Sequence, residues 1–144
     1  MVDTLCSIML ILIVVAGTSS YRYHSAALAH KADLYVNAAR SSLLLCESWA
    51  GVHGAETFDP VSYLGPDVTI ATITGGSVPA DFTLIGSYKI DLNGAAYLLT
   101  MSWKDIDTDL RALNVSAAWA QQHKTVTGFD DTDKTFSLTT YVTD

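Results

Sequence analysis

The sequence predicts an α+β fold in which a long N-terminal helix, at about residues 2–49, packs its second half on a four-stranded antiparallel β-meander. Three observations predict this fold. The first fifty residues contain no proline, and they are rich in alanine and leucine, which favour helix. From residue 82 onward, apolar and polar residues alternate with the period of two that is typical of half-buried strands. Between residues 51 and 81, prolines and paired glycines interrupt both patterns and indicate a connecting region.

The first half of the predicted helix, residues 1–25, is dominated by an apolar run. From Leu5 to Ala16 it reads LCSIMLILIVVA, in which Ser7 is the one polar break, and Asp3 stands ahead of it. The run is at the short limit for a membrane span, which needs about 20 residues. It lacks the preceding basic region of a conventional signal peptide. We therefore expect residues 1–25 to be buried in a membrane or among other copies of the chain, with a partner for Asp3.

The second half of the helix, residues 26–50, mixes alanine and leucine with a minority polar face, and we expect it to end at Gly51. Between the halves lies a patch of low helix propensity where the helix is predicted to loosen, formed by Gly17, Ser19 and Ser20. Cys6 and Cys46 lie forty positions apart, which on one helix is roughly 60 Å, too far for an intrachain disulfide.

Residues 26–144 are predicted to form a globular head made of the helix 26–50, a connecting loop 51–81 and a sheet 82–144. The loop contains one short predicted strand at Val68–Thr74. The sheet strands are expected near 82–90, 97–103, 113–119 and 135–142, with a type I′ turn at Asn93-Gly94. Such a meander has one apolar face that needs a cover. The alanine and leucine face of the helix is expected to provide it.

Charge is distributed unevenly along the chain. The first fifty residues have as many acidic as basic residues, so the net charge of −7 lies entirely after residue 50. This acidic half argues against nucleic-acid binding, which requires clustered positive charge. It suits a surface that remains soluble.

Motifs for chemistry are missing from the sequence, so we predict that the chain is not an enzyme. It contains no nucleophile elbow, P-loop or dinucleotide fingerprint, and its four histidines lack metal-ligand spacing. Asp105, Asp107 and Asp109 match the first three ligands of a calcium loop. However, Leu110 and Ser116 occupy the places of the required glycine and glutamate, so a solvated acidic turn is the better interpretation.

The layout of the first fifty residues resembles that of type IV pilins and of the pseudopilins of type II secretion. The matching elements are Asp3, the apolar run from Leu5, the patch at Gly17–Ser20 and the stretch from Ala26 to Leu45. The family's early acid is usually a glutamate two places further from the mature terminus. The mid-helix proline and the C-terminal disulfide loop of many members are missing here.

The resemblance implies a subunit of an extracellular filament that polymerises through its N-terminal helix. In the family, the early carboxylate pairs with the N-terminal amine of a neighbouring subunit, a role that would fall to Asp3. The apolar assembly contacts would then fall to Leu5, Ile8, Leu12 and Val15. The resemblance also implies storage in the inner membrane, processing by a prepilin peptidase and use of an assembly machinery. No cofactor is expected apart from calcium, for which the resemblance suggests Asp130, Asp131 and Asp133, because major pseudopilins bind calcium in a similar late loop.

Two alternatives remain open from the sequence. One is a type II secretion pseudopilin, which forms a short periplasmic piston. The other is a single-pass membrane anchor that holds a β-domain binding module. A plain anchor gains nothing from an acid at residue 3 or from the long helical stretch that follows the apolar run, whereas a filament core uses both.

Overall fold

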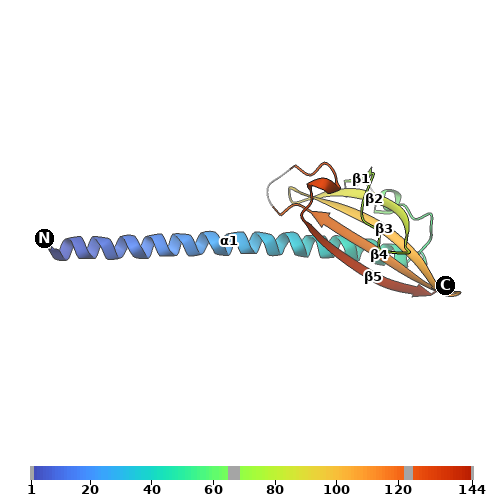
Figure 1. The fold of residues 1–144 in the computed structure, drawn as a ribbon, viewed down its shortest axis with the longest axis horizontal. Coiled ribbons are helices and arrows are strands. Elements are labelled where there is room, and N and C mark those ends of the chain that lie inside the picture. The colour runs from blue at the N-terminus through green and yellow to red at the C-terminus, as the bar shows by residue number, and fades with distance from the viewer. Residues whose placement is uncertain (1, 65–68, 122–124, 144) are drawn as a thin grey trace. The chain divides into compact units, whose positions relative to one another are not determined.

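The structure is a computed structural model that describes residues 2–64, 69–121 and 125–143, with all side chains in these ranges except those of residues 2–6 and 64. The chain divides into two compact units, Met1–Asp33 and Leu34–Asp144. The first is the N-terminal part of helix α1 (Val2–Ala50), and the second contains the remainder of α1, a short helix and a sheet (Figure 1). The boundary follows Asp33, whereas the sequence had suggested a division after residue 25.

Helix α1 confirms the helix predicted at about residues 2–49. It ends in a tight turn in which His53 and Gly54 have positive φ angles of 54° and 66°. The backbone N–H of Gly54 donates to the carbonyl of Trp49 at 3.0 Å. A Cβ atom at Gly54 would lie 2.9 Å from Leu113 Cδ2, so this turn requires glycine. The left-handed residues that close the helix are therefore His53 and Gly54 rather than Gly51, where the sequence had placed the stop.

A second helix, α2 (Pro60–Leu64), lies in the segment that was predicted as a connecting loop. Proline at the first helical position has a φ angle that suits a helix start. Asp59 precedes it, and its carboxylate accepts hydrogen bonds from Ser62 Oγ at 2.7 Å and from the backbone N–H of Val61 at 3.1 Å. These bonds, led by the one from Ser62, hold the pKa of Asp59 below its usual value.

The sheet of the second unit is antiparallel throughout, and its strands follow in chain order, as Figure 1 shows. They are β1 (Ile70–Ile73), β2 (Thr83–Leu92), β3 (Ala95–Asp107), β4 (Leu110–Trp119) and β5 (Lys134–Thr143). The α+β class and the meander are confirmed, but the predicted number of four strands was wrong by one. The short strand expected at Val68–Thr74 joins the sheet, because Ile70–Ile73 pairs with Ser87–Ile90 of β2.

Two turns connect the central strands. Asn93 and Gly94 have φ angles of 53° and 78°, as a type I′ turn requires. At the next connection, strand structure continues through most of the predicted acidic turn, since β3 extends to Asp107 and β4 begins at Leu110. A shift of register between Asp105 and Asp107 marks a bulge there.

One face of the sheet packs on the second half of α1, as the sequence predicted. The helix contributes the buried side chains of Leu34, Ala38, Leu45, Cys46 and Trp49. The strands contribute Tyr88, Ile90, Tyr97, Leu99, Met101, Leu113, Val115, Ala117 and Trp119. The indole of Trp49 is fully buried, donates from Nε1 to the carbonyl of Ala55 at 2.9 Å, and stacks on Phe58 with ring centroids 6.3 Å apart.

A smaller apolar cluster lies on the opposite face of the sheet. It contains Leu98 of β3, Ala118 of β4 and Val126, with Phe129 packed against it. The last two residues come from the long loop before β5, which the sequence indicated to be polar. Strand β3 is therefore buried on both faces, although its alternation predicted a single apolar face.

The thiol of Cys46 belongs to the main core and is expected to be inert. It is 2% exposed, and burial, with a smaller effect of the Glu47 charge, raises its pKa to about 11. At pH 8 only about 0.1% of such a thiol is ionised, and the thiolate is the reactive form. In a Cys6→Ser variant, we expect a thiol-specific reagent to label the native chain at least about 100-fold more slowly than free cysteine. Full labelling in denaturant is the control, and rapid labelling of the native chain would contradict this burial.

Candidate assembly surface

An unbroken row of exposed apolar side chains lies on the first unit. It consists of eight consecutive residues, from Ile8 to Val15, whose side chains are between 55% and 69% exposed. Single exposed apolar side chains are ordinary on protein surfaces, but contiguous patches mark binding surfaces. We call residues 8–15 the apolar run.

The apolar run surrounds the helix on every side. Successive residues of an α-helix are rotated by about 100°, so the seven steps from Ile8 to Val15 pass almost twice around the axis. A helix that is hydrophobic all round is normally enclosed by other apolar groups. A single partner packed on one side would leave part of the run in water. The run therefore fits an environment that encloses the helix, such as several neighbouring helices.

The predicted contact residues share one side of the helix. Ile8, Leu12 and Val15 are spaced by four and three positions, which places them on one face, and they are 56%, 61% and 55% exposed. The backbones of Asp3 and Leu5 belong to α1, but their side chains lie outside the described part of the structure. The role predicted for Asp3 therefore stays a prediction.

The predicted loosening patch follows the apolar run directly. In the structure, α1 is helical through Gly17, Ser19 and Ser20. The hydroxyl of Thr18 donates to the carbonyls of Val14 and Val15 at 2.9 and 3.0 Å. Such bonds back to the preceding turn slightly destabilise and often bend helices. Loosening at this patch stays a prediction.

Among the residues that the structure describes, no helix meets the requirement for crossing a bilayer.

The calcium candidates Asp130, Asp131 and Asp133 lie in the loop before β5, in or beside a 3-10 turn at Phe129–Asp131. The carboxylate of Asp131 accepts from the N–H and the hydroxyl of Thr127 at 3.0 and 2.6 Å, and that of Asp133 accepts from the N–H of Gln121 at 2.7 Å. Through these hydrogen bonds, the carboxylates of Asp131 and Asp133 stabilise the conformation of the loop. Across residues 7–63, 69–121 and 125–143, no three histidine, cysteine or acidic side chains gather as a possible metal site.

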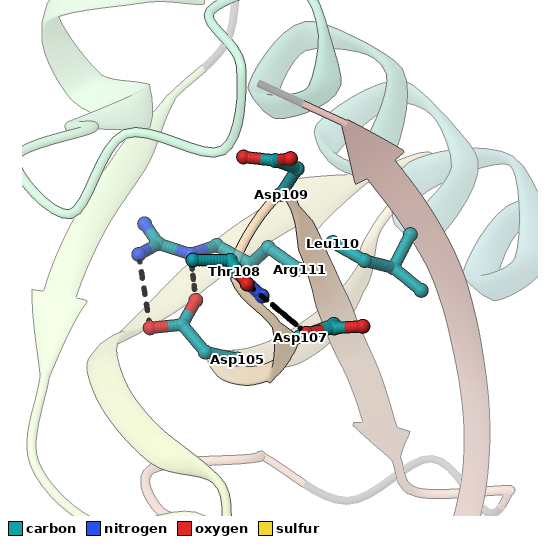
Figure 2. Close-up of a pocket in the computed structure, with 6 residues that line it drawn as sticks. All are labelled: Asp105, Asp107, Thr108, Asp109, Leu110 and Arg111. Carbon is teal, nitrogen blue, oxygen red and sulfur yellow. Dashed lines mark hydrogen bonds and ion pairs between the residues drawn. The ribbon is translucent and has the colours of Figure 1, made fainter.

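A hollow of about 210 Å³ lies at the hairpin between β3 and β4, lined by Asp105, Asp107, Thr108, Asp109, Leu110 and Arg111. Figure 2 shows the guanidinium of Arg111 bound to Asp105, and the backbone N–H of Thr108 bound to Asp107. The acidic turn that the sequence indicated thus contains an internal cation. In this contact, Arg111 Nε donates to Asp105 Oδ1 at 2.7 Å.

Arg111 connects the hairpin to the turn that ends α1. Its guanidinium donates to the carbonyl of Gly54 at 3.0 Å and to Glu56 at 3.3 Å, and it lies 4.1 Å from the ring centroid of Trp103. This hub was not predicted, because Gly54 and Glu56 precede Arg111 by more than fifty positions. Within the sequence, part of this hub is indicated only by an acidic residue that is followed by a turn and then by an arginine.

Removing this hub is expected to loosen the second unit. We expect Arg111→Met, which keeps the stem and removes the fork, to lower the free energy of unfolding by about 1–2 kcal/mol, since its partners are partly exposed. The matched control is Lys104→Met, whose one ion pair, to Asp81 at 3.3 Å, is exposed. Thermal unfolding followed by circular dichroism compares them. Equal stability of the two variants would contradict the importance of the hub.

The sequence Asn114-Val-Ser116 matches a glycosylation sequon, but its asparagine is not accessible. Asn114 is 2% exposed, and its Nδ2 donates to Ser137 Oγ at 2.8 Å and to Thr139 Oγ1 at 2.9 Å. The amide nitrogen that a glycan would occupy is therefore used inside the sheet.

No family model matches the chain, and comparisons with curated proteins and with solved structures find no significant similarity.

The apolar run is the feature of the described structure that most needs a partner, and it is the candidate functional site.

Proposed function

We propose that this chain is a structural, pilin-like subunit of an extracellular type IV pilus-like filament, in which it polymerises through its N-terminal helix. The observation that carries the proposal is the apolar run, eight consecutive side chains that are more than half exposed on every side of the helix. The role is structural and involves no catalytic step. The partner is the chain itself, in a helical homopolymer.

The energy available from the apolar run supports polymerisation. Burying one Val, Leu, Ile or Met side chain stabilises by about 1.5–3 kcal/mol. Eight such side chains in a filament core provide a gross stabilisation on the order of 10 kcal/mol, from which the loss of translational and rotational freedom is subtracted. Contacts that continue from one copy to the next are heterologous, and heterologous contacts extend into filaments when they do not close into rings.

The path to the filament follows from the resemblance described above. Before assembly the apolar half of α1 is held in the inner membrane, and a prepilin peptidase and an assembly machinery act on the subunit. In the filament, the acidic second units form the outer surface on the cell, where adhesion and motility are the roles that the family suggests.

Filament formation in the native cell tests the proposal. We expect negative-stain microscopy of sheared surface material to show long fibres that contain this chain. Asp3→Ala is expected to abolish or strongly slow their formation, because the N-terminal amine of the neighbouring subunit would be left buried without its carboxylate partner, which is costly. The matched control is Asp33→Ala, which removes a carboxylate that is exposed on the same helix. Fibres that appear only on overexpression would favour the short pseudopilin assembly.

Two outcomes would contradict the proposal at different levels. A cell surface without fibres, combined with a membrane-held monomer, would favour the anchored binding module. A wild-type yield of fibres from Asp3→Ala would leave the filament in place and remove the role of Asp3 in subunit register.

A further inference from the structure

A band of exposed cationic and aromatic residues follows the apolar run on α1. It contains Tyr21, Arg22, Tyr23, His24 and Lys31, and we call it the cationic band. Tyr21 and Tyr23 are 75% and 74% exposed, more than any other large apolar side chain in the described structure. Arg22 and Lys31 form no ion pair with any residue whose side chain is described.

Acidic and basic residues are distributed unevenly along the chain. No acidic residue occurs between residues 4 and 32, although the whole chain has fifteen. After residue 50 there are twelve acidic and five basic residues. Three of those bases, Lys89, Lys104 and Arg111, already pair with carboxylates of the same unit. The second unit thus presents an excess of carboxylates, many of them exposed, such as Asp81 at 79%.

We propose that the cationic band is the site on which the acidic second units of neighbouring copies dock, one beside Arg22 and another beside Lys31, which lie nine positions apart and therefore on opposite sides of the helix. This inference rests on the proposed filament, because the apolar run brings the subunits together. Units that each bear a charge of −7 repel one another when they are packed in a polymer, and cations on the adjacent helix offset that repulsion. Tyrosine and arginine are also the residue types that concentrate binding energy at interfaces.

The position of the band suits this contact. It begins six residues beyond Val15, about 9 Å further along the helix, so it lies just outside the apolar run. Electrostatic complementarity fixes register and suppresses wrong partners more than it adds raw affinity. The apolar run, which is nearly uniform around the helix, does not by itself define how far one subunit is displaced along its neighbour. The cationic band would help to set that displacement, together with the register role proposed for Asp3.

The dependence of assembly on salt distinguishes the contact made by the cationic band from the contact made by the apolar run. The Debye length falls from about 30 Å at about 0.01 M salt to about 3 Å at about 1 M. We expect the critical concentrations of the wild type and of a variant without the band cations, measured by sedimentation, to differ at low salt and to converge over that range, because salt screens both the attraction and the repulsion between charged units. Arg22→Gln/Lys31→Gln filaments are expected to need a concentration about three- to tenfold higher than the wild type at low salt and about the same concentration as the wild type at about 1 M salt. The matched control is Arg40→Gln/Lys134→Gln, which removes two exposed cations outside the band and should keep the wild-type response.

The outcomes distinguish the two levels of the proposal. If the wild-type chain forms no filaments, the proposed function fails and this contact fails with it. If filaments form and the band variant keeps the wild-type salt response, or the control loses it equally, only the contact is overturned. A band variant with normal filaments and weakened binding to vesicles of anionic phospholipid would overturn it too, and would assign the band to the lipid surface.

Discussion

Replacing Leu12 by aspartate is expected to abolish filament formation while leaving the second unit folded. Leu12 lies in the middle of the apolar run, is 61% exposed in the single chain, and would be enclosed in the filament. An unpaired carboxylate enclosed there costs several kcal/mol, which corresponds to a drop in assembly of about 1,000-fold or more. Leu12→Ala removes only apolar contact, so it should raise the critical concentration by about ten- to thirtyfold.

Sedimentation of filaments and circular dichroism of the monomer measure the two effects separately. Ile106→Asp is the matched control, because Ile106 is 50% exposed and lies in the β3–β4 hairpin of the second unit. It makes the same chemical change away from the apolar run, and we expect it to assemble normally. Normal assembly of Leu12→Asp would rule out the apolar run as the filament core.

Trp49→Ala is expected to cause the largest loss of stability in the second unit. The side chain is fully buried between α1 and the sheet, and its removal leaves a cavity, breaks the bond to the carbonyl of Ala55 and removes the stack on Phe58. Such a truncation costs about 3–5 kcal/mol. For a unit of this size the Tm should fall by about 12 °C or more.

Two further variants serve as comparisons for the loss of stability expected of Trp49→Ala. Trp49→Phe retains most of the volume and loses the indole donor, so about 1–2 kcal/mol is expected. Tyr141→Ala removes an aromatic side chain that is 61% exposed on β5, and its effect should stay within about 0.5 kcal/mol. A Trp49→Ala chain that unfolds at nearly the wild-type temperature would show that α1 does not cover the core.

The elements with strong local signals could be predicted from the sequence. The absence of proline before Pro60 and the density of alanine and leucine predicted α1 to within one residue at its C-terminal end. The period of two and the Asn93-Gly94 turn predicted the central hairpin. Each of these signals lies within a few positions of the structure that it specifies, and packing did not override it.

The features that were missed depend on residues that are distant in sequence. The strand at Ile70–Ile73 was recognised, but nothing near it identifies β2 as its partner. The cover over Leu98 comes from Val126 and Phe129, which stand isolated in a polar loop. The hub at Arg111 needs the backbone of Gly54, whose position depends on how α1 ends. The apolar run itself was evident from sequence, whereas its exposure on all sides required the structure.

The chain order of the strands has a consequence for the path by which the second unit folds. The hairpins of β2 with β3 and of β3 with β4 each close over a short connection, with a small entropic cost, so these three strands can form early. The contacts of Leu45 and Trp49 with these strands span more than thirty positions, and such non-local contacts form slowly. Until α1 docks, the apolar face of a nearly complete sheet remains open to other chains. We therefore expect the yield of subunits in the cell to depend on the rate of helix docking rather than on sheet formation.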